Sequence, residues 1–281
     1  DVSEDGFVYL SGETKGDLNG EINSGDEDAF LIKLDSDGNE IWTKLFGTPY
    51  SDIPWFSNID NDGNILLGGE TAGNLNGEIN NGIIEEDGIN QDSEDAFLIK
   101  VDPDGNEIWT KLFGTEGGEE LYSAVTSNDG SIYITGETRI DPLNSSEQYP
   151  FIQDGFVAKL DSNGNKIWES FIGTGFLDIQ DSEELENLDQ SDTSFFAIDI
   201  DNNGFIYAAG ETNVNLNGQN NRGGDDAFII KFDQEGNEIW TKLFGNEFYD
   251  FASGLKVADD GNIFISGAAS GNLNNQENNG N

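Results

Sequence analysis

Residues 95–114 read DAFLIKVDPDGNEIWTKLFG, and close copies of this stretch recur along the chain at 28–47, 154–173 and 226–245. A second segment, GNILLGGET at 63–71, returns at 6–14, 130–138 and 204–212, and in degraded form at 261–270. Internal self-similarity of this kind is the signature of a repeat architecture, in which one small structural unit is stacked several times. The repeat therefore decides the fold.

Within one unit the apolar pattern is that of short β-strands. Runs of about six residues, rich in β-branched and aromatic side chains, are bounded by Gly, Asn and Asp and lie at 96–102, 107–113, 121–127 and 131–136. We expect four strands per unit, named A to D in chain order, with tight turns at 104–106 and 128–130 in which Gly supplies a positive φ. Only 181–190 is long enough for a helix, and it lacks an apolar face.

Repeated four-strand units predict an all-β fold, a β-propeller built from four-stranded antiparallel blades, with about four and a half blades present. We expect one propeller segment over 1–281, with units at approximately 1–52, 53–119, 120–193, 194–250 and 251–281. The chain has no Met at position 1, so we expect a piece of a longer protein, truncated at both ends, whose ring is completed elsewhere. The repeated Trp should fill the space between blades, and Trp109 should be largely buried against a neighbour.

Composition excludes several functions. With 56 Asp and Glu against 12 Lys and Arg, the chain carries a formal charge of −44. It should be repelled by nucleic acids and by anionic lipid surfaces, so its natural partners are cations. Because it has neither Cys nor His, it has no zinc-thiolate site and no Ser-His-Asp or Cys-His machinery. No apolar run is long enough for a transmembrane helix.

The acidic residues that flank the loop between strands B and C are candidate calcium ligands. Antiparallel pairing should bring together the Glu that closes strand B and the Asp that opens strand C, and the loops between them add further oxygen ligands. Calcium takes six to eight such oxygens from carboxylates, amides and carbonyls. The predicted ligands are Glu13, Asp17, Asn19, Asp26, Asp28, Glu70, Asp95, Glu137, Asp154, Glu211, Asp225 and Asp226. Alternatively, these residues only satisfy loop backbone groups.

Other candidate sites are weaker. The segment beginning at Asp35 superficially resembles an EF-hand, but its Gly38 comes too early, so a hairpin turn is expected. Trp55 and Tyr50 occur in one copy only and could stack on a sugar ring or be buried. The acidic insertion at 174–193 is the one place where a unit carries acids that the others lack, as an enzyme would require.

Three segments carry a resemblance to a known family: SIYITGET at 131–138, GNLNGEINNG at 73–82 and DAFLIKLDSDGNEIWTKLFGT at 28–48. They resemble the bacterial β-propeller repeat called SBBP, found in secreted and surface proteins of cyanobacteria and other bacteria. The resemblance implies a propeller and an extracellular setting, and it implies no established reaction. A weaker resemblance links Asp35, Gly38 and Trp42 to the quinone-cofactor propellers, in which the Trp docks one blade on the next.

The sequence thus predicts a non-enzymatic structural or adhesive module, secreted or at the cell surface and stabilised by calcium. Its expected partners are calcium, extracellular polysaccharide and other surface proteins, with no nucleic acid and no membrane insertion. The alternatives are a lectin-like propeller and a propeller enzyme acting on polysaccharide. Four near-identical carboxylate pairs argue for architecture rather than catalysis.

Overall fold

A computed structural model describes residues 1–81, 84–85, 88–89, 94–115, 117–140, 152–173, 192–272, 276 and 278. Every regular element in this part of the chain is a β-strand, so the all-β prediction is confirmed. Across the described ranges no helix is long and apolar enough to cross a membrane. The segment 181–190 and most of the insertion at 174–193 lie outside the described residues.

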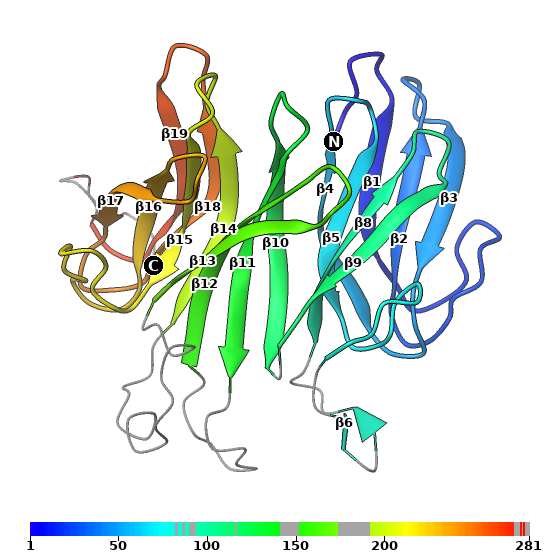
Figure 1. Cartoon of the computed structure of the whole chain (residues 1–281), viewed down its shortest axis with the longest axis horizontal. Helices are drawn as coiled ribbons and strands as arrows, with labels where there is room; N and C mark the ends of the chain where they lie inside the picture. Colours follow the sequence, from blue (N-terminus) through cyan, green and yellow to red (C-terminus); the bar gives the residue numbers. More distant parts are fainter. Residues whose placement is uncertain are drawn as a thin grey trace. The chain divides into compact units, whose positions relative to one another are not determined.

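The strands form a series of antiparallel sheets, each of which follows the order of the chain (Figure 1). Blade 1 contains β1 (Val8–Thr14), β2 (Asp28–Leu34) and β3 (Glu40–Phe46). Blade 2 contains β4 (Asp52–Ile59), β5 (Ile65–Thr71), β8 (Asp95–Val101) and β9 (Glu107–Phe113). Blade 3 contains β10 (Gly118–Thr126), β11 (Ile132–Ile140), β12 (Ile152–Leu160) and β13 (Lys166–Ile172).

Blade 4 contains β14 (Thr193–Ile200), β15 (Ile206–Thr212), β16 (Asp226–Phe232) and β17 (Glu238–Phe244). Blade 5 has only β18 (Asp250–Val257) and β19 (Ile263–Ala269). A short hairpin of β6 (Ile84–Glu85) and β7 (Gly88–Ile89) interrupts the loop of blade 2. Blades 2, 3 and 4 are therefore four-stranded antiparallel sheets, as predicted.

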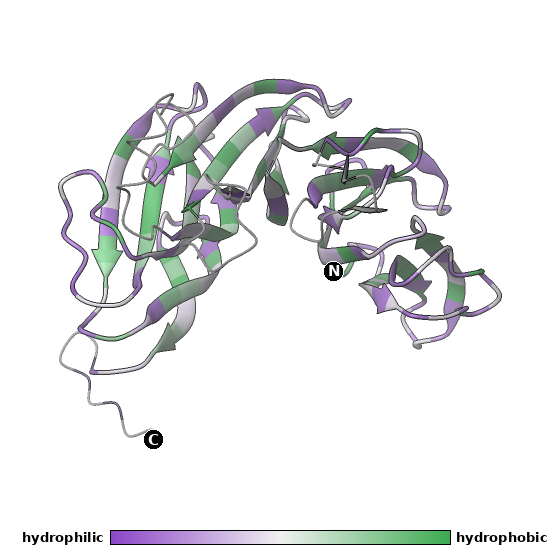
Figure 2. Ribbon diagram, turned by 90° about the horizontal axis from the view of Figure 1, so that it is seen from below, coloured by the Kyte–Doolittle hydropathy of each residue, from purple (hydrophilic) through white to green (hydrophobic). Residues whose placement is uncertain are grey.

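The chain divides into two compact units. One contains Asp1–Ile132 and Asp161–Asn165, and the other contains Tyr133–Leu160 and Lys166–Asn281. Apolar residues concentrate on the strands, whereas the loops are hydrophilic (Figure 2). In the first unit the facing sides of blades 1 and 2 share a core that includes Leu31, Leu67 and Phe97, each fully buried. In the second unit a core that includes Tyr207, Ile229 and Val257 joins blades 4 and 5.

The turn between strands C and D is stabilised by the carboxylate that opens it. In blade 2, Gly105 has φ 86° and donates its N–H to the Asp102 carbonyl at 3.0 Å. Asp102 Oδ1 accepts the N–H groups of Asp104 at 2.9 Å and Asn106 at 2.8 Å. Hydrogen bonds from the Asn106 side chain and backbone hold the pKa of Asp102 below its usual value. The predicted hairpin turn with a positive-φ Gly is confirmed, and its leading Asp is used by the turn itself.

A Trp from strand D of one blade docks on the C–D turn of the next blade. Trp42 Nε1 donates to the Pro103 carbonyl at 3.2 Å. In the same way Trp109 donates to Ser162 O at 3.3 Å, and Trp168 donates to Gln234 O at 3.0 Å. The role expected for the repeated Trp in joining blades is therefore observed three times.

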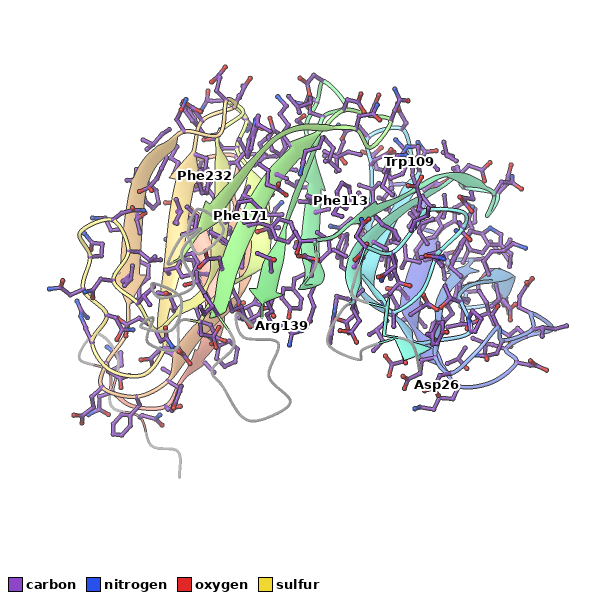
Figure 3. The ribbon with its side chains drawn as sticks, turned by 60° about the horizontal axis from the view of Figure 1, so that its bottom comes forward. Asp26, Trp109, Phe113, Arg139, Phe171 and Phe232 are labelled. Carbon is purple, nitrogen blue, oxygen red and sulfur yellow. The ribbon has the colours of Figure 1, made fainter. Side chains whose placement is uncertain are left out.

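The prediction that Trp109 is largely buried was wrong. Its side chain is only half-buried and lies over the turn that carries Gly164 (Figure 3). The physical reason is its place on β9, an edge strand of its sheet, where one face of the ring covers the neighbouring turn and the rest meets solvent.

Two glycines of the C–D turns offer a matched test of the docking contact. Gly38 and Gly236 have φ 83° and 85°, so an added Cβ strains both backbones alike. A Cβ on Gly38 meets nothing within 4 Å, whereas a Cβ on Gly236 lies 3.0 Å from two ring atoms of Trp168. We expect Gly38→Ala to lower the free energy of unfolding by about 1 kcal/mol and Gly236→Ala to lower it by about 1–3 kcal/mol more, measured by urea denaturation. Equal losses would show that the ring does not rest on the turn.

Candidate functional site

The loop between β1 and β2 holds itself together with the side chains that were predicted to bind calcium. Asp17 Oδ1 accepts the backbone N–H of Asn23 at 3.1 Å, and Asn23 Nδ2 donates to the Thr14 carbonyl at 2.9 Å. Asn19 has φ 51°, and its amide group donates to Glu40 Oε2 at 2.8 Å and to Thr43 Oγ1 at 2.9 Å. This pattern is the alternative interpretation of the loop, in which Asx side chains satisfy local backbone groups.

The same arrangement recurs in blades 2 and 4. Asn76 and Asn217 have φ 50° and 49°, and each donates its amide to a strand D threonine, at 2.9 Å and 3.0 Å. The asparagines that correspond to Asn23 tie their loops to the end of strand B: Asn80 to Thr71 O, Asn221 to Thr212 O and Asn278 to Ala269 O. The repeated loop asparagines therefore have a structural use.

Asp26 lies away from these contacts, at the exposed surface of the loop (Figure 3). Its carboxylate is 4.0 Å from Lys15 Nζ, which forms a closer ion pair with Glu27 at 2.7 Å. Hydrogen bonds from Lys15 and Ser51 lower the pKa of Glu27. Within the described ranges no group of three or more Asp, Glu, His or Cys side chains is arranged to hold a metal ion. The structure thus does not group Asp17 or Asp26 with two further acidic side chains of the described residues.

The strand register separates the predicted carboxylate pairs. In blade 1 Asp28 lies opposite Thr14, and Glu13 lies opposite Ala29. Because side chains alternate between the two faces of a strand, Glu13 and Asp28 lie on opposite faces of the sheet. The same register holds for Glu70 with Asp95 and for Glu211 with Asp226, so the proximity expected within these pairs is not observed. The expectation failed because the pairing is offset by one residue, which reverses the face.

In blade 3, Glu137 belongs to a polar cluster that occurs in one copy only. Gln153 Nε2 lies 3.0 Å from Glu137 Oε2, 2.8 Å from Asp192 Oδ1 and 2.6 Å from Ser194 Oγ. Arg139 Nε lies 3.4 Å from Glu137 Oε1. Sequence reasoning missed this cluster, although Gln153 replaces the acid that the other repeats have at Glu27, Glu94 and Asp225, and that difference was the available signal.

The charge of Asp192, a member of this cluster, also acts on the carboxyl group of Glu211. Burial, together with the smaller effects of the charges of Asp225 and Asp192, raises the pKa of Glu211 to about 7. Burial, followed by the charges of Asp192 and Asp226, also raises the pKa of Asp225. These shifts favour the protonated carboxyl and arise mainly from desolvation.

The Asp that opens each strand C is completely buried. Asp28, Asp95, Asp154 and Asp226 each have 0 % exposure. The glycine that follows strand D packs on the carboxylate, because a Cβ on Gly47 would lie 2.2 Å from Asp28 Cγ and one on Gly114 would lie 2.1 Å from Asp95 Cγ. The sequence singled out these four aspartates, but it did not indicate their burial.

A second acid from the next blade lies beside the strand C Asp at three of these positions. The N–H of Asp52 donates to the carbonyl of Glu27, the residue before Asp28, at 2.7 Å. Glu119 N bonds Glu94 O, and Asp250 N bonds Asp225 O, also at 2.7 Å. We call these the step pairs: Asp28 with Asp52, Asp95 with Glu119, and Asp226 with Asp250. The sequence did not indicate them, because the partners lie in different repeats.

Burial dominates the electrostatics of the step pairs. It raises the pKa of Asp95 to about 7, with a further contribution from Glu119 and an opposing one from the Asn81 N–H. It raises the pKa of Asp52 to about 6 against the hydrogen bonds of Thr71 and Thr48, and the charge of Asp28 adds to the increase. In the absence of a counter-ion, each pair therefore resists carrying two negative charges.

Trp55 lies within β4, at a bulge where the register with β5 shifts between Pro54 and Phe56. Its side chain is 49 % exposed, and its ring centroid is 5.7 Å from that of Tyr122 at an interplanar angle of 60°. Tyr122 donates its hydroxyl to Glu120 Oε2 at 2.6 Å. Tyr50 is also exposed, at 44 %, so the buried alternative for these two aromatics was wrong.

Comparison with known proteins gives distant relatives. No family model matches the chain. The chain is 26 % identical over 143 residues to the regulatory protein FlaEY of Caulobacter vibrioides, covering 49 % of this chain and 15 % of that protein. It is also 26 % identical over 123 residues to an uncharacterised WD repeat-containing protein of Acanthamoeba polyphaga mimivirus, covering 40 % of this chain and 9 % of that protein. The chain thus matches only a small part of these curated relatives.

Among solved structures, a mannose phosphorylase from Leishmania mexicana aligns with 94 % of this chain and 76 % of its own, with TM-score 0.39 and 10 % identity. The sequence relatives support a propeller-like repeat fold at a general level, and the SBBP family is not confirmed.

The raised carboxyl pKa values predict the pH dependence of stability. A carboxyl whose pKa is higher in the folded protein stabilises the fold fully below its unfolded pKa, and that contribution is lost as the pH rises through the folded pKa. For Asp52, Asp95 and Glu211 the loss falls between roughly pH 4 and 7. In chelator-treated buffer we expect urea denaturation to give a larger free energy of unfolding at about pH 5 than at about pH 8.

Asp95→Asn provides the control for this pH prediction, because it removes one titrating group and should reduce the difference between the two pH values. Below about pH 4 the turn aspartates, whose pKa values are lowered, reverse the trend. A free energy of unfolding that rises steadily from pH 5 to pH 8 would contradict the assignment.

Proposed function

We propose that the chain is a non-enzymatic structural and adhesive repeat module of a secreted or cell-surface bacterial protein, stabilised by calcium. The observation that carries this proposal is the use of the repeated polar residues. The turn aspartates, the loop asparagines and the docking Trp make the same structural contacts in successive blades. Catalysis requires acids whose environments differ from one another, whereas equivalent copies suit architecture.

The proposed setting and partners rest on the charge and on the family resemblance. A formal charge of −44 favours solubility and the binding of cations and opposes contact with nucleic acid or anionic lipid. The SBBP resemblance adds the extracellular location, where polysaccharide and other surface proteins are the available partners. An enzyme acting on polysaccharide is disfavoured, because Asp192, an acid that occurs in one copy only, is engaged by Gln153 together with the repeated Glu137.

Cell-surface labelling tests this proposal. An antibody raised against the purified chain should label intact cells of the organism that encodes it, since a surface module is accessible without permeabilisation. An antibody against a cytoplasmic enzyme serves as the control and should label permeabilised cells only. Labelling by both antibodies only after permeabilisation would reject a surface location.

A lectin-like function is the second candidate, favoured by the exposed Trp55 beside Tyr122. Aromatic rings with one open face stack on the apolar face of a pyranose, and a strand supplies a rigid support. Asn58 Nδ2 donates to the Ala124 carbonyl, which ties β4 to β10 and fixes the two rings relative to each other. Since the chain is strongly acidic, neutral or amino-bearing sugars fit better than uronic acids.

Titration with neutral and amino-bearing oligosaccharides, followed by tryptophan fluorescence, tests the lectin function. We expect saturable quenching that Trp55→Ala reduces at least tenfold in affinity, because the stacking surface is lost. Tyr50→Ala is the matched control: its ring is similarly exposed but has no aromatic neighbour at the bulge, so binding should be unchanged. Equal effects of both variants, or no saturable quenching, would exclude this platform.

A further inference from the structure

The step pairs of blades 1 and 2 contain buried carboxylate oxygens that no protein group satisfies. Asp28 Oδ2 accepts the Ser24 N–H at 2.8 Å, and Asp95 Oδ2 accepts the Asn81 N–H at 2.9 Å. The other oxygen of each, Oδ1, has no hydrogen-bond partner among the described residues, although both side chains have 0 % exposure. Buried oxygens of this kind are costly and require an explanation.

The second acid of each step pair increases the cost of burying these carboxylates without a counter-ion. Asp52 adjoins Asp28 through the bond from its own N–H to Glu27 O, and Thr48 N–H and Oγ1 hold its carboxylate at 2.6 Å and 3.0 Å. Glu119 is placed in the same way beside Asp95, and it accepts the Thr115 N–H at 2.9 Å. Two carboxylates in a dry site repel each other unless a proton or a cation is bound between them.

Blade 4 shows what the chain places at an equivalent position. Arg222 occupies the position of Ser24 and Asn81 in the repeat. Its guanidinium donates to the Gly245 carbonyl at 3.0 Å, and Gly245 is the glycine packed on the Asp226 carboxylate. Both carboxylate oxygens of Asp226 also lack a hydrogen-bond partner among the described residues, but here the Arg222 guanidinium supplies a positive charge beside the step pair.

At the strand C Asp of blade 3, the following blade does not provide a second acid. Thr193 stands at the position that Asp52, Glu119 and Asp250 occupy in blades 2, 3 and 5, and its hydroxyl bonds that of Thr212 at 2.8 Å. Asp154 therefore has no second acid at the start of the following strand A. Among the described residues there are thus two step pairs whose loop position holds Ser24 or Asn81, one whose loop position holds Arg222, and one position at which Thr193 replaces the second acid.

We propose that Asp28 with Asp52 and Asp95 with Glu119 each bind one calcium ion between consecutive blades. This inference rests on the proposed function, of which it locates the calcium dependence. A divalent ion balances the two negative charges of each pair and is coordinated by the Oδ1 atom that lacks a hydrogen-bond partner. Calcium accepts carboxylates together with backbone carbonyls and water in irregular geometry, whereas magnesium demands a near-ideal octahedron. Backbone oxygens and water complete the shell, since each pair offers only two acidic side chains.

Isothermal titration of the whole chain with calcium chloride, at physiological ionic strength in sodium chloride, tests the two sites. We expect a stoichiometry of two, with weaker binding of magnesium. Asp28→Asn and Asp95→Asn should each lower the stoichiometry to one. Asp154→Asn is the matched control and should leave it at two, because Thr193 stands where the other blades place the second acid of a step pair.

Two arginine variants keep the test independent of folding. Ser24→Arg and Asn81→Arg place at blades 1 and 2 the side chain that blade 4 already has, so each should abolish one calcium site while the far-UV spectrum and the metal-free melting temperature are retained. Circular dichroism of every variant shows whether it is folded.

No saturable binding, or equal loss in Asp154→Asn and Asp95→Asn, would overturn the proposal. The first result, together with higher stability at low pH, would mean that each pair shares a proton instead. Surface labelling of intact cells is unaffected by either result, so failure of the calcium sites and failure of the proposed function are distinguishable.

Discussion

The contact between an indole ring and a glycine turn is the constraint on which the blade arrangement depends. The ring can approach the turn closely only where no Cβ stands in the way, and the turn itself needs a residue that tolerates a positive φ. Gly105, Gly164 and Gly236 meet both needs at once. The indole N–H of each Trp donates to one carbonyl of the turn and so fixes where the ring lies along that turn. The contact between the strand D Trp and the C–D turn Gly thus helps to fix how consecutive blades are spaced and aligned.

Much of the fold could be predicted from the repeat itself. The strands follow from alternating and β-branched runs, and the turns follow from Asp and Gly at fixed offsets, because these are local properties. The outcome for Trp109 was harder to predict. Its partner lies on another blade, and its exposure depends on the edge position of β9, which only the assembled sheet defines.

For the candidate site, too, the sequence could not predict contacts between residues of different repeats. Sequence spacing indicated acids at the ends of strands B and C, yet an offset of one residue in the register placed Glu13 and Asp28 on opposite faces. The true neighbour of Asp28 is Asp52, which belongs to the following repeat. No pattern within a single unit could have identified that pair, because the second acid belongs to the next unit and its position holds Asp52, Glu119, Thr193 or Asp250 in different blades.

The docking Trp also determines how the protein can come apart. Each observed Trp contact joins one blade to the next in sequence, which is the condition for a nearest-neighbour system whose stability is a sum of unit and interface terms. Unfolding is then cooperative only through the contacts between neighbouring blades. Partial unfolding begins at a blade that has a neighbour on one side only. Indole emission would register such opening link by link, so the array contains its own set of optical reporters.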